Sequence, residues 1–358
     1  MPRPSAPRPR PARQSTTPPE AAAAAAREAS PRPVAWTGAS VRLLDQTLLP
    51  DRLADVDIHR VDDLVAAIRR LAVRGAPALG IAGAYGVALA IVQAAREGWD
   101  GSTFTAAVGR LHAAKPTALA LAQGVDAAYA VVDDGLDAVV AVGRALAEAD
   151  ERVNRAIGRH GADWIIGRLG DRPLRVLTHC NTGALATAAW GTALGIIREL
   201  HARGRVELVY VDETRPLLQG SRLTAWELAQ AGIDYRVQVD GAAAGTIVGG
   251  LVDVAIVGAD RIAVNGDVAN KVGTLGVALA CAHAGIPFVV AASASTVDED
   301  LPSGAGIPIE QRGDDEVLAW AARRVAPPGA RAHNPAFDVT PATLVSALVT
   351  EHGPVHRH

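Results

Sequence analysis

The sequence predicts an α/β protein in which a helical N-terminal domain precedes a domain with a doubly wound parallel sheet. Segments with apolar residues at helical spacing dominate the chain up to about residue 170. After that point, short apolar runs alternate with helical segments, which is typical of parallel strands covered by helices on both faces. The chain has 358 residues and a hydrophobic content of 49%, enough for two cores.

The first 33 residues differ from the rest of the chain. They are rich in Pro, Ala and Arg and have no apolar period, so we expect a disordered tail over residues 1–33. They lack the apolar stretch of a secretory signal, and an organelle transit peptide is the alternative to a plain tail.

The N-terminal domain is predicted over residues 34–170 and is mainly helical. Residues 61–75 have helical spacing and begin with Asp62 and Asp63, whose charges favour the positive end of a helix. Further helical spacing covers residues 104–132 and 139–169.

Residues 76–95 contain no charged side chain over twenty positions, which is the length needed to cross a bilayer. Ala and Gly dominate the segment, and neither contributes much to membrane insertion. We therefore expect a helix buried within the protein, and no membrane partner.

The sheet domain is predicted over residues 171–350. Strands are expected at residues 174–180, 206–211, 235–239, 252–258 and 287–292. Helices are expected at residues 183–202, 221–231 and 243–250, and after Lys271. Sheets of this kind bind ligands beyond the carboxyl ends of their strands.

Composition and motifs argue against several classes of function. A formal charge of −3 and a pI near 6.4 give no electrostatic reason to expect nucleic acid as a partner. No G-x-G-x-x-G follows the first strand of the sheet domain, and P-loop, zinc and Gly-x-Ser-x-Gly motifs do not occur in the sequence. We therefore expect no cofactor and no metal. Two cysteines are too few for a disulfide framework, which favours the cytoplasm.

Polar residues gather where the predicted strands end. Cys180 ends the first strand, residues 212–220 follow the second, and residues 258–274 follow the fourth. Because the carboxyl ends of parallel strands meet at one edge of a sheet, we expect these segments to converge on one crevice.

Cys180 and Asp260 are the candidate reactive groups. Cys180 precedes a predicted helix start that would favour a thiolate, and a small buried filler is an equally good interpretation. Asp260 is a candidate general acid or base, with a structural ion pair to Arg261 as the alternative. Cys281 lies within a helical apolar pattern and is expected to be core.

Two segments have the features of an anion site, with phosphate as the natural ligand. Asn270 and Lys271 precede a predicted helix, where N–H groups, the helix dipole and an ammonium group combine. Arg74 precedes Pro77 at the start of the buried helix, and a guanidinium there would bind phosphate through two N–H groups. Lys115 also precedes a helix, but a solvated helix end is the simpler interpretation of Lys115 alone.

Six segments, taken together, resemble the methylthioribose-1-phosphate isomerase family, whose relatives include the regulatory subunits of translation initiation factor 2B. They cover nearly all of the chain after the tail, in the order of the family. The segments are LLDQTLLP (43–50), RGAPALGIAGAYG (74–86), LTHCNTGALAT (177–187), DETRPLLQGSRLTAWEL (212–228), GADRIAVNGDVANKVGT (258–274) and NPAFDVTP (334–341).

The resemblance implies a fold, an assembly and a reaction. The fold would be a helical domain followed by a Rossmann-like domain, assembled as a homodimer. The reaction would convert 5-methylthioribose 1-phosphate into 5-methylthioribulose 1-phosphate in methionine salvage, without a cofactor. The catalytic cysteine of the family falls on Cys180, and its catalytic aspartate, the proton donor, falls on Asp260. Substrate contacts fall on Arg74, Gly75, Ala76, Gln219, Asn270 and Lys271, and on Lys115.

One segment departs from the family. Relatives have Arg-Pro-Thr-Ala-Val-Asn-Leu where this chain has Lys115 in place of the arginine and Ala120 in place of the asparagine. The substrate choice is therefore open, because isomerases of 5-deoxyribose 1-phosphate and ribose 1,5-bisphosphate share the scaffold. A non-catalytic regulatory subunit is the rival from another class, but it gives no reason for Cys180, Asp260 and Gln219 to occur together.

The implied chemistry assigns roles to the two candidate reactive groups. Phosphate blocks the anomeric oxygen of the substrate, so a free aldehyde cannot form. We expect Asp260 to protonate the ring oxygen and Cys180 to assist the passage of hydrogen from C2 to C1. An apolar crevice would raise the pKa of Asp260 and keep it protonated near neutral pH.

Overall fold

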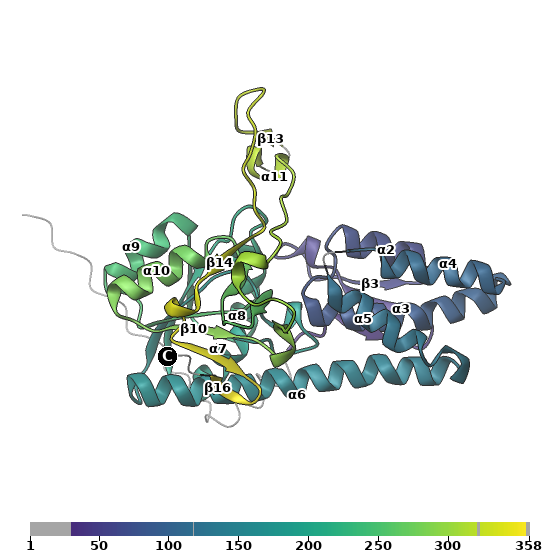
Figure 1. The fold of residues 1–358 in the computed structure, drawn as a ribbon, viewed down its shortest axis with the longest axis horizontal. Helices are drawn as coiled ribbons and strands as arrows, with labels where there is room; N and C mark the ends of the chain where they lie inside the picture. Colours follow the sequence, from purple (N-terminus) through teal and green to yellow (C-terminus); the bar gives the residue numbers. More distant parts are fainter. Residues whose placement is uncertain (1–29, 117, 321–322, 356–358) are drawn as a thin grey trace, which may run out of the picture.

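The computed structural model describes residues 30–116, 118–320 and 323–355, so all but the last four residues of the predicted tail lie outside the described residues. Two domains lie side by side along the longest axis of the molecule (Figure 1). Helix α6 (Leu136–Leu169) runs below both and contacts elements of each. Residues 30–33 contact the protein body, since the Trp190 N–H donates to Ser30 Oγ at 3.0 Å and Arg32 pairs with Glu151 at 2.7 Å.

The N-terminal domain is mainly helical, but it begins with an antiparallel sheet that the sequence does not predict. The strands are β1 (Val34–Trp36), β2 (Val41–Leu44) and β3 (Asp55–Ile58). With three or four residues each, they are too short to show a clear alternation. The helices are α2 (Val61–Arg69), α3 (Ala76–Glu97), α4 (Gly101–His112), α5 (Leu119–Tyr129) and α6.

Helix α3 is the segment of membrane length, and it is a core helix of this domain, as predicted. By length and composition it could cross a membrane, yet 78% of its most apolar window is buried inside the protein. Its small residues allow close packing on α5: a Cβ on Gly124 would lie 2.0 Å from the carbonyl oxygen of Gly80. The Ala and Gly content of α3 therefore supports helix packing.

The C-terminal domain contains a seven-stranded sheet with the order β16-β15-β10-β7-β4-β5-β6. Its strands are β4 (Leu174–Thr178), β5 (Val206–Asp212), β6 (Tyr235–Gln238), β7 (Val254–Val257), β10 (Phe288–Ala291), β15 (Ala347–Thr350) and β16 (Gly353–Val355). All neighbours pair in parallel except β15 and β16. Numbered along the chain, the parallel strands have the order 3-2-1-4-5-6 of a Rossmann-like sheet, which confirms the predicted fold class.

Helices cover both faces of this sheet. Helices α6, α7 (Ala193–Ala202) and α8 (Ala225–Gln230) pack on one face, and α9 (Ala243–Val248) and α10 (Thr274–Ala284) pack on the other. The predicted helix over residues 183–202 is wrong in its first half, where a short 3₁₀ turn and a loop precede α7. The reason is that side chains take the backbone N–H groups of this segment: Glu227 accepts from Ala184, and Asp150 accepts from Ala188.

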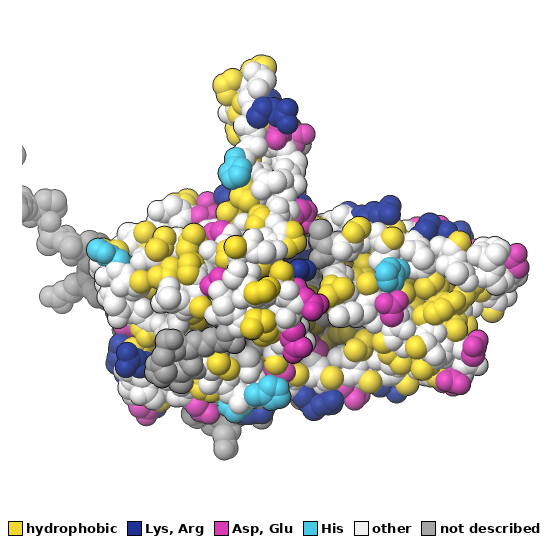
Figure 2. Space-filling model, viewed as in Figure 1, with side chains coloured by type: hydrophobic (Ala, Val, Ile, Leu, Met, Phe, Trp, Pro, Cys, Tyr) yellow, Lys and Arg dark blue, Asp and Glu magenta, His cyan; other side chains and the backbone are white. Residues whose placement is uncertain are grey.

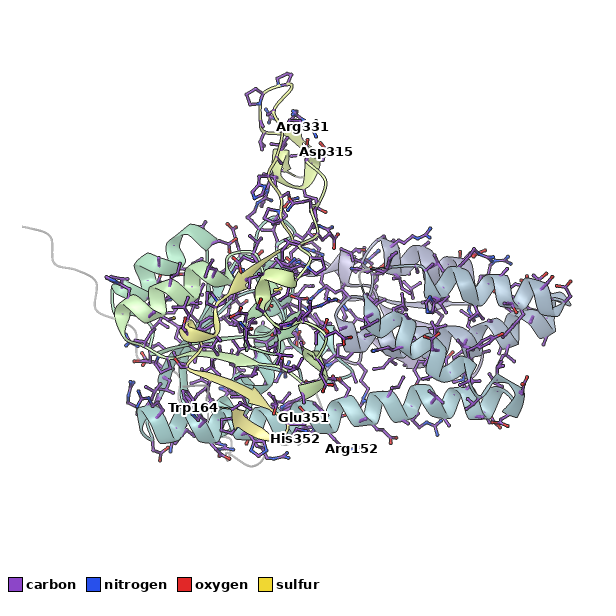
Figure 3. The ribbon with its side chains drawn as sticks, viewed as in Figure 1. Arg152, Trp164, Asp315, Arg331, Glu351 and His352 are labelled. Atoms are coloured by element: carbon purple, nitrogen blue, oxygen red, sulfur yellow. The ribbon has the colours of Figure 1, made fainter. Side chains whose placement is uncertain are left out.

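A second sheet, with the order β11-β8-β9-β14, lies beyond the carboxyl end of β7. Its strands are β8 (Arg261–Ala263), β9 (Val268–Lys271), β11 (Val297–Asp298) and β14 (Phe337–Thr340). The arm, residues 309–320 and 323–334, rises from the body next to β14 and includes α11 (Asp315–Leu318), β12 (Ala319–Trp320) and β13 (Arg323–Arg324). Asp315 and Arg331 lie on it (Figure 3).

The remaining elements of the described chain are short turns. The 3₁₀ turns are η1 (Gln46–Leu48), η2 (Val132–Asp134), η3 (Ala184–Ala186), η5 (Asp240–Ala242), η6 (Ala294–Thr296), η7 (Gly304–Gly306) and η8 (Ala342–Leu344), and η4 (Gly220–Thr224) is a π-type turn that leads into α8.

Candidate active site

Cys180 and Asp260 follow the two neighbouring strands at which the winding of the sheet reverses. Cys180 lies two residues after β4, and Asp260 lies three residues after β7. The carboxyl ends of such a strand pair form the usual ligand crevice of a doubly wound sheet. Figure 2 shows the surface hollowed where the two domains meet, with acidic and basic side chains at the margin.

The backbone at Cys180 is in the left-handed region, with φ of 68°. A side chain makes this conformation costly, so it persists only where surrounding contacts fix it. Here the Cys180 N–H donates to Thr214 Oγ1 at 2.9 Å, and the Thr224 hydroxyl donates to the Cys180 carbonyl oxygen at 2.7 Å. The cysteine is thus held from two neighbouring segments and remains only 7% exposed.

The expected thiolate at Cys180 is not supported. No helix follows Cys180 directly, so the helix dipole that the sequence suggested is not available to it. Burial raises the pKa of the Cys180 thiol, although Lys271 and Arg74 act in the opposite direction. Cys180 therefore presents a neutral thiol near neutral pH.

Asp260 has the protonation behaviour expected of a general acid. Burial raises the pKa of its carboxyl group above the ordinary value, against the charges of Lys271, Arg74 and Lys115. The side chain still reaches solvent, as a group that contacts a ligand must. The alternative ion pair with Arg261 is not formed, because Arg261 pairs with Asp298 at 3.3 Å. Within the described residues, the Asp260 carboxyl group has no hydrogen bond or ion pair.

The start of α3 lies against the cysteine loop. Arg74 donates to the carbonyl oxygen of Asn181 at 3.1 Å and also to its side-chain oxygen. Gly75 has φ of 90°, and a Cβ there would lie 2.0 Å from the carbonyl oxygen of Ala186. Only glycine fits at this contact. Ala76 begins α3 and is exposed.

Asn270 and Lys271 lie on β9, which corrects the expectation of a loop immediately before a helix. Helix α10 begins three residues after Lys271. The Lys271 ammonium donates to the Ala336 carbonyl oxygen at 2.8 Å and lies 4.5 Å from the centre of the Phe337 ring. The Asn270 amide donates to Thr274 Oγ1 at 2.9 Å. A strand thus holds these side chains more rigidly than a loop would.

Three predicted substrate contacts carry a buried polar atom without a hydrogen-bond partner in the described part of the chain. They are Arg74 Nε, Gln219 Oε1 and Asn270 Oδ1, among six such atoms in all. Buried polar groups are normally paired, so each calls for a partner. The free donor of Arg74 suits an anionic group of a ligand, and the free acceptors of Gln219 and Asn270 suit hydroxyl groups.

Lys115, from the N-terminal domain, is close enough to Asp260 and Lys271 for their charges to shift its pKa. Burial lowers the pKa of its ammonium group, the charges of Glu310 and Asp260 raise it, and those of Arg312 and Lys271 lower it further. Glu310 and Arg312 belong to the base of the arm. Lys115 is therefore partly buried among site charges, and a freely solvated helix end does not describe it.

Four residues that the sequence did not single out support the cysteine loop: Asn181, Thr214, Thr224 and Glu227. Glu227 is completely buried and accepts from Asn181 Nδ2 at 2.9 Å, from the Ala184 N–H at 2.8 Å and from Arg198 at 3.2 Å. A charged residue within the apolar helical pattern of α8 was the only sequence signal for this network.

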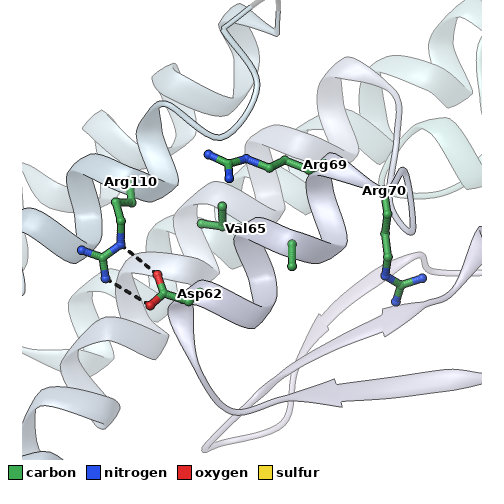
Figure 4. A pocket seen from close by; sticks show the side chains of 6 residues that line it. Asp62, Val65, Arg69, Arg70 and Arg110 are labelled. Atoms are coloured by element: carbon green, nitrogen blue, oxygen red, sulfur yellow. Dashed lines mark hydrogen bonds and ion pairs between the residues drawn. The ribbon is translucent and has the colours of Figure 1, made fainter. Parts of the chain in front are cut away.

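There are two other clusters of polar side chains. One already has its polar atoms engaged in hydrogen bonds, and the other lies away from the residues described above. His179, Asp212 and Asp240 lie close enough to hold a metal ion, but Asp240 accepts from the N–H groups of Thr214 and Arg215. A shallow pocket on α2 and α4 is lined by Asp62, Val65, Ala66, Arg69, Arg70 and Arg110 (Figure 4). Arg110 pairs there with Asp62 at 2.8 Å, and Arg70 pairs with Asp45 at 2.8 Å.

Proteins of known family resemble this chain in sequence and in structure. The sequence model of the Initiation factor 2 subunit family matches residues 72–356. A methylthioribose-1-phosphate isomerase of Alkalilimnicola ehrlichii is 49% identical over 330 residues, which are 90% of this chain and 94% of the relative. A probable bifunctional methylthioribose-1-phosphate isomerase/methylthioribulose-1-phosphate dehydratase of Nocardia farcinica is 52% identical over 90% of this chain, which spans only 58% of that relative. The crystal structure of 5-methylthioribose 1-phosphate isomerase from Pyrococcus horikoshii is 36% identical, with a TM-score of 0.83 over 92% of this chain and 94% of that one.

Proposed function

This chain belongs to the Initiation factor 2 subunit family and, within it, to the methylthioribose-1-phosphate isomerases, and from this premise we propose that it converts 5-methylthioribose 1-phosphate into 5-methylthioribulose 1-phosphate. The chain is then an aldose–ketose isomerase of methionine salvage. The dehydratase activity in the name of the Nocardia relative is not carried over, because this chain spans 58% of that protein. The observation that carries the proposal is the position of Cys180 and Asp260 just after the two strands at which the winding of the sheet reverses, with burial raising the pKa of Asp260.

The reaction rearranges bonds within one molecule. One hydrogen passes from C2 to C1, and the bond between C1 and the ring oxygen breaks. The C2 hydroxyl group loses its proton to become a carbonyl group, and the ring oxygen gains a proton to become a hydroxyl group, so the number of protons is unchanged. C1 is reduced and C2 is oxidised, so no external oxidant is needed. In the proposal, Asp260 gives its proton to the departing ring oxygen, and Cys180 assists the hydrogen transfer from the opposite flank of the crevice.

Binding is assigned to side chains from both domains. Arg74 and Lys115, with the N-terminal turn of α3 at Gly75 and Ala76, would bind the phosphate group, because positive charge and free N–H groups meet there. Gln219, Asn270 and Lys271 would bind the sugar hydroxyl groups; the unpartnered oxygens of Gln219 and Asn270 support this assignment.

A cytoplasmic homodimer is part of the proposal, as is a reaction without cofactor or metal. Both cysteines are free and buried, which suits a reducing compartment. The dimer follows from the family resemblance, and light scattering of the purified chain tests it directly.

The decisive experiment compares three substrates. Purified protein is incubated with 5-methylthioribose 1-phosphate, 5-deoxyribose 1-phosphate and ribose 1,5-bisphosphate, and the ketose product is followed by ¹³C NMR. The highest kcat/KM is expected for the methylthio sugar. Preference for another sugar would reassign the substrate, and no turnover of any of the three would favour the regulatory-subunit interpretation.

A further inference from the structure

His179, the residue before Cys180, is a completely enclosed imidazole with both ring nitrogens engaged. Its Nδ1 lies 3.0 Å from Asp212 Oδ2, and its Nε2 lies 2.8 Å from the carbonyl oxygen of Val272. The side chains of His179 and Asp212 are each only 1% exposed. The ring is too enclosed to touch a substrate, so any part it plays in the reaction passes through other residues.

The two partners bear on the protonation of the ring. A carbonyl oxygen only accepts, so Nε2 carries a proton. Burial raises the pKa of Asp212, which His179 and Gln238 oppose, and where Asp212 is ionised it also accepts, so that Nδ1 carries a proton too. Burial opposes the charged imidazolium, but the hydrogen bond and charge of Asp212, with the charge of Asp240, outweigh it and raise the pKa of His179. Gln238 donates to the second oxygen of Asp212 at 2.8 Å, which further stabilises the carboxylate.

The imidazole joins three strand ends. His179 itself follows β4, Asp212 ends β5, and Val272 directly follows Lys271 at the end of β9. The contact with β9 is close: Gly273 has φ of 107°, and a Cβ there would lie 2.7 Å from the ring. A side chain at this position would displace the ring or the strand end.

The Asp212 segment also holds the Cys180 backbone. The Thr214 hydroxyl donates to the Asp212 carbonyl oxygen at 2.9 Å and accepts from the Cys180 N–H at 2.9 Å. Asp212 is therefore linked to Cys180 by its side chain, through His179, and by its backbone, through Thr214. Movement of this pair would shift the thiol and the strand end that carries Lys271 together.

We propose that the His179–Asp212 ion pair is a positioning device of the isomerase site, which fixes the Cys180 loop and the strand end that carries Lys271 relative to each other without touching the substrate. The inference rests on the proposed function, because the pair can act on catalysis only if the chain is an isomerase. A misplacement of about 1 Å in a reacting group is able to cost roughly 10²-fold in rate, so losing the pair should act on kcat.

The test uses substitutions that each keep one of the two ring contacts. In His179→Gln the amide reaches the position of Nε2 and keeps the bond to Val272, whereas in His179→Asn it reaches the position of Nδ1 and keeps the bond to Asp212. Both variants should lower kcat roughly 10²-fold. The matched control is Leu174→Ala, at the other end of β4, which should lower the melting temperature but keep the wild-type kcat. Wild-type kcat in either folded His179 variant overturns the proposal.

The Asp212→Asn substitution tests the charge of the Asp212 side chain separately from its shape. The substitution keeps the volume, removes the charge that raises the pKa of His179, and leaves Asp240 and Asp338 as the other acidic groups that act on the ring. The pKa of the His179 imidazole, followed by NMR of its ring, should fall in this variant. An unchanged His179 pKa overturns the role of the charge.

A thiol assay keeps this inference distinct from the proposed function. The alkylation rate of Cys180 by iodoacetamide, read from its peptide by mass spectrometry, should change in the His179 variants and remain at the wild-type value in Leu174→Ala. Equal rates in all proteins overturn the positioning role, whether or not the wild type turns over any of the three sugars. Absence of turnover in the wild type, with altered alkylation in the variants, overturns the proposed function alone.

Discussion

Arg74 of the helical domain donates two hydrogen bonds to Asn181, the residue that follows the cysteine at the centre of the sheet domain. The contact joins the two domains next to Cys180. It also leaves the Nε–H group of Arg74 buried and without a partner in the described residues. Arg74 thus orients the cysteine loop, and in the proposed function this N–H group donates to the substrate.

Arg74→Lys should lower kcat/KM by roughly 10–100-fold, because a lysine keeps the charge but loses the planar group of donors that serves Asn181 and the ligand together. The control is Arg69→Lys, an exposed arginine on α2, which should behave as wild type. Steady-state kinetics of both variants checks this. Equal losses in the two variants would contradict a specific role of Arg74.

Cys180→Ser and Asp260→Asn should each lower kcat by about 10²–10⁴-fold in a folded protein, as expected for a lost group that transfers hydrogen. Cys281→Ala is the matched control, because Cys281 is fully buried in the core between α10 and the sheet. It should lower the melting temperature and keep the wild-type kcat. Loss of kcat in folded Cys281→Ala would show that thiol substitution disturbs the site in general.

The pH dependence of kcat should report the acid form of Asp260. Because burial raises its pKa, the carboxyl group stays protonated to higher pH than an ordinary aspartate, and kcat should fall as the pH rises through this raised value. The residual activity of Asp260→Asn should lack that limb. A limb that persists in Asp260→Asn would have to come from another group.

Lys115→Ala should raise KM strongly if Lys115 binds the phosphate group, since a charge-assisted contact contributes about 1.5–3 kcal/mol. Lys115→Arg should be tolerated, because it keeps the positive charge. Both variants are compared with wild type on the methylthio and 5-deoxy sugars. Should Lys115→Ala leave KM unchanged on both, the phosphate contact would be ruled out.

Asp150→Asn should stabilise the protein at neutral pH. Burial raises the pKa of Asp150 to about 6, so ionisation of this side chain destabilises the native state. The cost is absent at low pH, grows between about pH 4, where the unfolded carboxyl group ionises, and the raised value, and is constant above it. The same carboxylate oxygen accepts from the Ala188 N–H and from Asn154, and an amide oxygen can replace it. Urea unfolding at pH 4 and pH 7 should show an advantage of the variant that grows with pH, to at most about 3 kcal/mol. A constant difference would contradict the shifted pKa.

Much of the architecture follows from apolar patterning alone. The strands β7 and β10 are apolar throughout and fully buried, and β4 is buried at every position except Arg175, so the sequence predicts them with little ambiguity. That Cys180 and Asp260 lie at the same edge of the sheet also follows, because parallel strands joined by helices place their carboxyl ends together. The order of the strands does not follow from the pattern and comes from the structure.

The local conformation around Cys180 could not be predicted in the same way. Residues 183–192 look helical by composition, but carboxylates distant in sequence, Glu227 and Asp150, take their N–H groups. The left-handed backbone at Cys180 depends on hydroxyl groups of Thr214 and Thr224, which lie more than thirty residues away. Such long-range contacts leave no periodic signal in the sequence.

The strand order also determines how the sheet can be completed as the chain leaves the ribosome. The first strand made, β4, is central, and β5 and β6 add outward on one side before β7, β10 and β15 add outward on the other. No later strand has to be inserted between two strands that are already paired. Domains made from the N-terminus onward fold in order of synthesis. The cysteine therefore emerges with the first strand, and its place beside the aspartate exists only after the second flank of the sheet has begun to form.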